Sequence, residues 1–308
     1  MESMRDLLKY YDKDNKMQEQ FEAILREEVF TDTDVKGFLN EHQDLSEEVI
    51  RRSSAILYEF VNEKKKFQHN ERGLVSGHYP VLVRHNNQIE IEYVPTKEEK
   101  QRQKQVSEKK RLNLFYMQSD VQGASFDTLE LTQQREEAIV KATDFITQYD
   151  PKSAEYQKAL YLHGAFGVGK TFLLGAVAKA LTKKGHTVAL VYYPSFCTDM
   201  KESIRDNSVN QKVDYFKSVE VLMLDDIGAE SLSTWIRDDI LGIILQHRMQ
   251  YNLPTFFTSN LSMQQLQDEH LSTANNGAHE PMKARRIMER IKYLAEEIEL
   301  KGKNKRHS

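Results

Sequence analysis

The chain has 308 residues, of which 39% are hydrophobic and 29% charged, and its formal net charge is −4. This length exceeds one typical domain, so we expect two domains, with enough apolar residues for packed cores. Because the chain lacks an apolar stretch of 18 residues and has a single cysteine, Cys197, we expect no membrane span, no intrachain disulfide and a cytoplasmic location. The charged amino-terminal sequence also argues against a signal peptide.

The first sixty residues are predicted to be helical and acidic. Residues 1–61 carry 15 acidic and 8 basic side chains. The sequence Thr31-Asp32-Thr33-Asp34 predicts a helix cap, because short oxygen-bearing side chains accept hydrogen bonds from the first free backbone N–H groups. Apolar residues recur at roughly helical spacing in two stretches: Phe21, Ile24, Leu25 and Val29, then Ile50, Ile56, Leu57, Phe60 and Val61. Such a module is either a partner-binding domain or a scaffold.

The next segment changes character. Tyr79–His85 and Ile89–Val94 are β-like runs, and the Asn86-Asn87-Gln88 sequence between them predicts a hairpin. Lys97–Arg111 is almost uninterrupted charge and glutamine, which predicts a linker or an exposed helix. We therefore predict an amino-terminal domain of residues 1–94, a charged linker of residues 95–119 and a second domain of residues 120–308.

From about residue 125 the sequence alternates between helical and strand-like segments. A helix is predicted over residues 133–149, ending before Asp150-Pro151. Short apolar strands are predicted at residues 160–163, 187–192, 219–224, 255–259 and 297–300. Strands that alternate with helices form a parallel sheet covered on both faces. The sequence therefore predicts an α/β domain.

The most specific motif is the loop after the first of these strands. It matches G-x-x-x-x-G-K-[ST] and consists of Gly164, Ala165, Phe166, Gly167, Val168, Gly169, Lys170 and Thr171. The glycines let the backbone turn tightly and point its N–H groups at phosphate oxygens. Lys170 would place its charge on the β- and γ-phosphates, and Thr171 would offer its hydroxyl to Mg²⁺. We predict a nucleotide and Mg²⁺ site at this loop.

Polar side chains follow two later strands. Asp225 and Asp226 end the apolar run Val221–Leu224, so the strand delivers both carboxylates to the edge where ligands bind in open α/β sheets. Asp225 is expected to hold Mg²⁺ and Asp226 to orient or deprotonate the attacking water. Asn260 is expected to contact that water or the γ-phosphate. The alternative is that these residues merely cap the helices or turns that follow.

Two groups of basic residues complete the candidate site. Arg286 and Arg290 lie on one face of a predicted helix, and an arginine aimed at a γ-phosphate, in some proteins from a neighbouring subunit, stabilises transition-state charge. We prefer Arg290; the alternative is a salt-bridged surface helix.

For single-stranded DNA the candidates are Lys201 and Arg205 with two aromatic neighbours, Tyr192 and Tyr193. The alternative there is a solvated helix with core tyrosines.

In their order along the chain, these features resemble an AAA+ ATPase. More narrowly, Leu224–Glu230 and Trp235–Asp238 resemble bacterial primosomal helicase loaders of the DnaI/DnaC kind, as do Phe256–Asn260 and Arg286–Arg290. The resemblance spans roughly residues 120–300, and residues 1–94 resemble the amino-terminal domain of the DnaI type.

The resemblance implies an AAA+ P-loop sheet, preceded by a small helical domain that binds the hexameric replicative DNA helicase. It also implies binding of ATP and single-stranded DNA, contacts with other primosome proteins, self-assembly on the helicase ring and a weak ATPase activity stimulated by DNA or a partner. Such a protein loads the helicase during replication initiation or restart. The alternatives are a transposition-accessory ATPase of the same branch and a small-molecule kinase with the same phosphate loop.

One departure from the resemblance concerns zinc. Relatives of the DnaI type carry a cysteine and histidine zinc site in the amino-terminal domain, whereas residues 67–93 of this chain contain no cysteine. Three scattered histidines, His69, His78 and His85, make a poor structural zinc site without a thiolate. We therefore expect zinc to be absent.

Overall fold

The computed structural model describes residues 20–304, with the exception of residues 21, 119, 120, 122, 131, 232 and 276. The chain divides into two compact units, residues 1–105 and residues 106–308, and the boundary falls within helix α5 (Lys97–Arg111). Phe21, part of the predicted helical pattern, lies outside the described residues. Among the helices of the described part, none combines the length and hydropathy that crossing a membrane requires.

The amino-terminal unit is mainly helical over residues 22–68, as predicted for this part, and the prediction for residues 1–19 lies outside the described residues. A wide π-type turn (Leu25–Val29) precedes α2 (Thr33–Glu41), α3 (Glu47–Arg52) and α4 (Ser54–Gln68). Asp32 caps α2, because its Oδ1 accepts hydrogen bonds from the backbone N–H groups of Asp34 at 2.9 Å and Val35 at 3.2 Å. This confirms the predicted cap, which satisfies two of the donors that a helix start leaves without intrahelical partners.

The predicted hairpin is confirmed. Strands β1 (His78–His85) and β2 (Gln88–Pro95) pair antiparallel. Asn86 and Asn87 connect them with φ angles of +46° and +61°, as a two-residue turn of this type requires, and asparagine tolerates this region better than most residues. Ile89, which is 1% exposed, joins the core of this unit.

The charged segment after the hairpin is a helix, α5, followed at once by a strand that the sequence analysis did not predict. Leu112–Phe115 forms β3 and pairs in parallel with β5, with Leu112 opposite Val188. Four residues with no turn signal before them are too short to stand out as a strand. The pairing partner, more than seventy residues away, determines the conformation.

The carboxy-terminal unit confirms the predicted α/β fold. Within the described residues, six parallel strands form one sheet in the order β3-β5-β6-β7-β4-β8. Besides β3, these are β4 (Ala159–His163), β5 (Val188–Tyr192), β6 (Val221–Asp225), β7 (Thr255–Ser259) and β8 (Ala295–Glu299). The ends of each strand other than β3 lie within two residues of the predicted ends.

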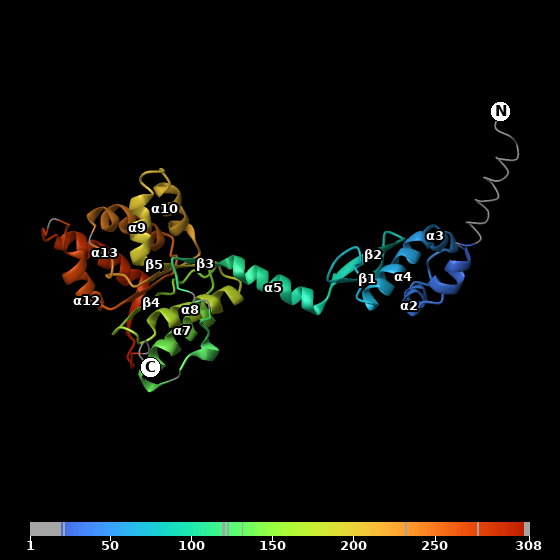
Figure 1. Ribbon diagram of the computed structural model, residues 1–308, viewed down its shortest axis with the longest axis horizontal. Helices are drawn as coiled ribbons and strands as arrows, with labels where there is room; N and C mark the ends of the chain where they lie inside the picture. Colours follow the sequence, from blue (N-terminus) through green and yellow to red (C-terminus); the bar gives the residue numbers. More distant parts are fainter. Residues whose placement is uncertain are drawn as a thin grey trace, which may run out of the picture. The chain divides into compact units, whose positions relative to one another are not determined.

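Helices cover both faces of this sheet (Figure 1). One face packs against α7 (Glu136–Gln148) and α8 (Lys170–Lys183), and the other against α9 (Tyr193–Glu202), α10 (Val209–Ser218), α11 (Gly242–Gln250) and α13 (Pro281–Leu294). Short helical turns lie at Phe126–Thr128, Gln133–Arg135, Ile236–Leu241, Met263–Gln265 (α12) and Leu266–Leu271. Side chains of successive strand residues point to opposite faces. Val221 and Met223 of β6 therefore join one core, and Leu222 and Leu224 join the other.

Arg248 of α11 is fully buried and joins three elements. Its guanidinium donates to Val219 O at 2.7 Å before β6, and to Pro254 O and Thr255 Oγ1 at 2.7 Å at the start of β7. It also donates to the carbonyl oxygen of Phe216 at the end of α10. Burial lowers the pKa of Arg248 from its ordinary value, and these acceptors offset the cost of burying its charge.

Replacing Arg248 by methionine should destabilise the carboxy-terminal unit by about 3–5 kcal/mol, because several carbonyl oxygens would remain buried without a donor. The free energy of unfolding measured by urea titration tests this. Arg285→Met, at an exposed position of α13, is the control and should change it by less than about 0.5 kcal/mol. Equal effects of the two substitutions would contradict the structural role of Arg248.

Candidate functional site

A large cavity opens at the carboxyl edge of the sheet in the second unit. It has a volume of about 1180 Å³. Its lining comes from the loop between β4 and α8, from the tips of β6 and β7, and from the segment before α7. Lys170, Thr171, Asp225, Asp226 and Asn260 all line it. The structure therefore brings together side chains from three strand ends that the sequence analysis singled out separately.

The loop between β4 and α8 has the backbone of an anion-binding loop. Gly167 and Gly169 have φ angles of +75° and +95°, a region that residues with a side chain rarely adopt. Gly169 immediately precedes α8, whose first residue is Lys170. The first N–H groups of a helix have no intrahelical partner and lie at the positive end of its dipole. This end of α8 therefore suits a phosphate group.

Lys170 is held inside this loop. Its Nζ donates to Gly164 O at 2.8 Å, to Ala165 O at 3.0 Å and to Asn260 Oδ1 at 2.8 Å. Only 7% of the residue is exposed. The ammonium group is thus positioned between the loop and the tip of β7, where a phosphate would meet it after little movement of the side chain.

Asp225 is buried at the end of β6 and is held by two hydroxyl groups. Thr171 Oγ1 donates to Asp225 Oδ1 at 2.8 Å, and Thr258 Oγ1 donates to the same oxygen at 2.7 Å. Burial raises the pKa of Asp225 to about 6, against the hydroxyl hydrogen bonds, which lower it. A carboxylate beside a hydroxyl is the oxygen donor set that Mg²⁺ prefers, with phosphate oxygens and water completing its coordination.

Asp226 and Asn260 form a second pair beside Asp225. Asn260 Nδ2 donates to Asp226 Oδ1 at 2.9 Å, and the backbone N–H of Asp226 donates to Thr258 Oγ1 at 2.8 Å. Asp226 has a φ of +63°, which is uncommon for a residue with a side chain and costs free energy unless the surroundings impose it. Hydrogen bonds from its backbone N–H to Thr258 and from Asn260 to its carboxylate accompany this conformation. Because Asn260 also accepts a hydrogen bond from Lys170, its side chain links the Asp226 carboxylate to the Lys170 ammonium group.

Neither Arg286 nor Arg290 is among the described residues that line this cavity. Arg286 is exposed on α13. Arg290 is half-buried and its Nη1 donates to Gly242 O at 2.7 Å. Burial, with a smaller contribution from the charge of Arg286, lowers the pKa of Arg290 from its ordinary value. Within one chain, the structure does not bring the predicted arginines to the predicted phosphate position.

The candidate DNA residues divide into two kinds. Lys201 and Arg205 are exposed. Tyr193 is 1% exposed and belongs to the core, so it is unavailable for stacking on a base, and the alternative of a core tyrosine applies to it. Tyr192 is half-buried and lines the large cavity.

The histidines of the amino-terminal unit make local contacts. His69 Nδ1 lies 2.8 Å from Lys65 O, and His78 Nδ1 lies 2.9 Å from Ser76 O. In the part of the chain that the structure describes, no group of three or more His, Cys, Asp or Glu side chains is arranged to hold a metal. The absence of zinc remains a prediction.

Sequence reasoning missed the contribution of the segment before α7. Tyr116, Met117, Val121, Leu129 and Arg135 all line the cavity. None of them belongs to a recognisable motif, and apolar residues ahead of a helix are common. Because they lie about 30 to 50 positions before the phosphate loop, no local sequence pattern predicts that they approach it.

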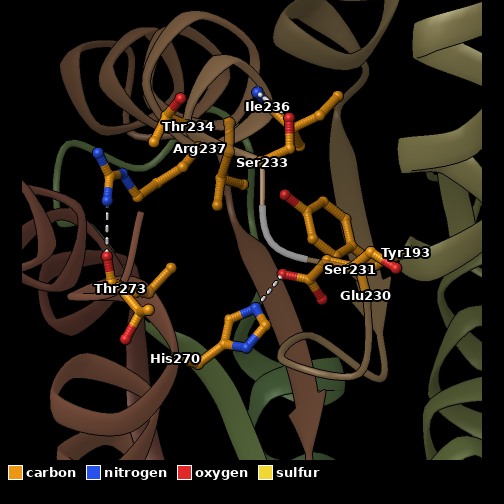
Figure 2. A pocket seen from close by; sticks show the side chains of 11 residues that line it. Tyr193, Glu230, Ser231, Ser233, Thr234, Ile236, Arg237, His270 and Thr273 are labelled. Carbon is orange, nitrogen blue, oxygen red and sulfur yellow. Dashed lines mark hydrogen bonds and ion pairs between the residues drawn. The ribbon is translucent and has the colours of Figure 1, made fainter. Parts of the chain in front are cut away.

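A second, small cavity lies near the loop that follows β6 (Figure 2). Its volume is about 20 Å³, room for a water molecule and nothing larger. Glu230 Oε1 and His270 Nε2 lie 2.8 Å apart in it, and Glu230 Oε2 accepts a hydrogen bond from Gly228 N at 2.7 Å. Arg237 Nη1 donates to Leu271 O at 2.8 Å. This cluster fastens the loop after β6 to the turn Leu266–Leu271 and is too small for a substrate.

Two family models match the chain. The model described as "Primosomal protein DnaI N-terminus" matches residues 1–93, and the model described as "IstB-like ATP binding protein" matches residues 85–307. The first match covers most of the amino-terminal unit. The second covers the whole parallel sheet and the large cavity.

Individual relatives agree with these matches. The "Replicative helicase loader DnaI" of Bacillus subtilis is 38% identical over 290 residues, which cover 92% of each chain. A crystal structure of DnaI has 44% identity and a TM-score of 0.56, over 64% of this chain and 98% of that one. A putative primosome component from Streptococcus pyogenes has 38% identity and a TM-score of 0.53, over 65% of this chain and 98% of that one.

The raised pKa of Asp225 predicts a pH-dependent stability in the absence of nucleotide and Mg²⁺. Because the folded protein holds this proton up to about pH 6 and the unfolded chain releases it near pH 4, the contribution to stability is full below pH 4. It is lost as pH rises through 6, by at most about 3 kcal/mol. Asp225→Asn removes this dependence. Its free energy of unfolding should therefore rise relative to the unsubstituted protein between pH 4 and pH 7.

Urea unfolding at several pH values between 4 and 7.5 measures this difference. The control is Asp214→Asn, on the exposed surface of α10, which should follow the unsubstituted protein at every pH. A difference between Asp225→Asn and the unsubstituted protein that stays constant with pH would contradict the assignment of the buried proton.

Proposed function

This chain belongs to the DnaI family of replicative helicase loaders, and from that premise we propose that it places the hexameric replicative helicase onto DNA in an ATP-dependent step. The carboxy-terminal unit binds and hydrolyses ATP, and the amino-terminal unit binds the helicase. The observation that supports the ATP-dependent step is the hydrogen-bond network around the phosphate loop. In it, Lys170 donates to Asn260, Asn260 donates to Asp226, and Thr171 donates to the adjacent Asp225.

Each member of this network has a role in the proposal. Gly164, Gly167 and Gly169 shape the loop around the phosphates, and Lys170 exchanges its carbonyl partners for phosphate oxygens. Thr171 and Asp225 would hold Mg²⁺, which would supply positive charge to offset that of the phosphates. Asp226 accepts a proton from, or orients, the attacking water, and Asn260 keeps that carboxylate in place. The segment before α7 supplies apolar side chains for the base, among them Met117, Val121 and Leu129.

Lys170 and Arg135 are the cations among the described residues that line the cavity, and Arg135 donates to Val168 O of the loop, so the proposed ATPase activity takes a further arginine from outside one chain. This arginine is Arg286 or Arg290 of a neighbouring subunit, on the helicase ring or in a self-assembled loader. Arg286 is exposed on α13 and is able to reach a neighbour. Arg290 would have to leave its hydrogen bond to Gly242 O. This arrangement would keep hydrolysis slow until subunits assemble.

The amino-terminal part supports helicase loading over the rival functions. We propose a helicase-binding domain of residues 1–94, a connecting segment of residues 95–119 and an ATPase domain of residues 120–308. The match of the DnaI amino-terminal family to residues 1–93 favours a loader over a transposition-accessory ATPase or a small-molecule kinase. Lys201 and Arg205 remain candidates for single-stranded DNA, because both are exposed cations, Lys201 near the end of α9 and Arg205 in the turn that follows it.

Substitutions at the phosphate loop and at α13 should separate ATP binding from turnover. Lys170→Ala should weaken ATP binding by about two orders of magnitude, because a buried charged donor to the phosphates is lost. Arg286→Ala and Arg290→Ala should leave the Kd for ATP within about two-fold but lower turnover at least about ten-fold in the assembled state. Equilibrium binding of labelled ATP and phosphate release with the helicase present measure both. Arg285→Ala, on the same helix, is the control, and unchanged turnover in both arginine variants would remove the assignment.

Capture of the helicase should depend on the amino-terminal domain. The tagged full chain should retain the replicative helicase of the same organism, whereas a chain that begins at residue 95 should lose it and still bind ATP. ATP hydrolysis should also rise when single-stranded DNA is added. Equal capture by both chains, or phosphorylation of a small molecule without any response to DNA, would contradict the proposal.

A further inference from the structure

The chain after β8 runs back across the phosphate loop. Leu300 N donates to His163 O at 2.7 Å, so the segment continues the pairing of β8 with β4 to the point where the loop begins. The described chain then extends through Lys301, Gly302 and Lys303 to Asn304. We call residues 300–304 the carboxy-terminal strap.

The strap touches the loop at two glycines. A Cβ atom placed on Gly164 would lie 2.3 Å from Leu300 O, and one placed on Gly167 would lie 1.9 Å from Asn304 Oδ1. Real Cβ atoms do not approach other atoms below 3.0 Å. The strap therefore packs directly on the loop backbone, and part of the reason for glycine at positions 164 and 167 is this close approach.

Arg135 connects the same two segments from another direction. It is 5% exposed, and its Nη2 donates to Val168 O at 2.5 Å, within the phosphate loop. Its guanidinium lies 3.4 Å from the position of a Cβ on Gly169 and 3.5 Å from that of a Cβ on Gly302 in the strap. An ion pair with the exposed Glu130 at 4.0 Å completes its surroundings. The guanidinium is thus placed between the loop and the strap.

We propose that Arg135 is a positioning residue for nucleotide binding, and that it acts with the carboxy-terminal strap to hold the phosphate loop in its binding conformation. This inference rests on the proposed ATP site. Among the described residues that line the large cavity there is Arg135 but no residue of the strap. The described strap residues therefore contact the loop from outside the cavity lining.

The physical reason is the conformational freedom of the loop. A loop with glycines at positions 164, 167 and 169 has more backbone conformations to lose on binding than one with side chains. Contacts that restrict it beforehand shift that cost from the binding step to folding, and this raises affinity without any new contact to the ligand. Arg135 restricts the loop through Val168 O, and the strap restricts it through Gly164 and Gly167.

The Kd for ATP, measured for the full chain and its variants, tests whether Arg135 and the strap position the loop. With ribose-labelled ATP and Mg²⁺ on the full chain, Arg135→Gln should raise the Kd roughly ten-fold, because a charge-assisted hydrogen bond to the loop is lost. Arg135→Lys, which keeps a charged donor, should recover most of this loss. Asn304→Ala and a chain ending at Leu300 should each raise the Kd about three-fold. The matched control, a chain ending at Asn304, should bind ATP as the full chain does.

Three further readouts separate positioning from a general loss of structure. The effects of Arg135→Gln and of ending the chain at Leu300 should be less than additive in free energy when combined, because both act through the loop. The KM for ATP should rise while kcat at saturating ATP stays within about two-fold. The thermal transition of the chain ending at Leu300 should remain close to that of the full chain.

Full affinity in both the Arg135→Gln variant and the chain ending at Leu300 would overturn the inference, as would additive effects. A fall in kcat with an unchanged KM would also overturn it. If the unsubstituted chain itself fails to retain labelled ATP, the proposed function fails instead, so the two failures are distinguishable.

Discussion

The buried carboxylate of Asp225 is the constraint around which the site is arranged. Two hydroxyl groups from different elements, one at the start of α8 and one on β7, donate to it. Burying this carboxyl group costs free energy whenever it is ionised, as its raised pKa indicates. The fold therefore places an ionised carboxylate where burial makes its charge unfavourable. A divalent cation bound together with the phosphates would reduce this cost in free energy.

The scaffold around that point is built to be rigid. Alternate residues of the central strands fill two separate cores, so the tips of β6 and β7 have little freedom to move. Arg248 fastens the opposite ends of the same two strands. Rigid strands hold Asp226 in a backbone conformation that an isolated chain would avoid. The packing free energy of the two cores thus offsets the cost of the Asp226 backbone conformation, as is common at functional sites.

The sequence predicts those parts of the molecule that depend on local signals. The hairpin turn at Asn86 and Asn87, the cap at Asp32 and the loop from Gly164 to Thr171 each have a short signature, and parallel topology brings strand ends to one edge. The missed features depend on contacts between distant segments. β3 is a strand because of its pairing with β5, and Arg135 approaches Val168 across 33 positions. Such contacts leave no periodicity or motif in the sequence.

The outer strand beside β4 has a consequence for assembly. β8 carries Glu296, Glu297 and Glu299 with two buried apolar residues, Ala295 and Ile298. Each carboxylate has a partner within the chain, Lys141 for Glu296, the backbone N–H of Met263 for Glu297 and Lys301 for Glu299. Charged side chains along an edge strand disfavour its pairing with a second copy of the same strand. Growth of the sheet beyond β8 is therefore disfavoured even at high local concentration.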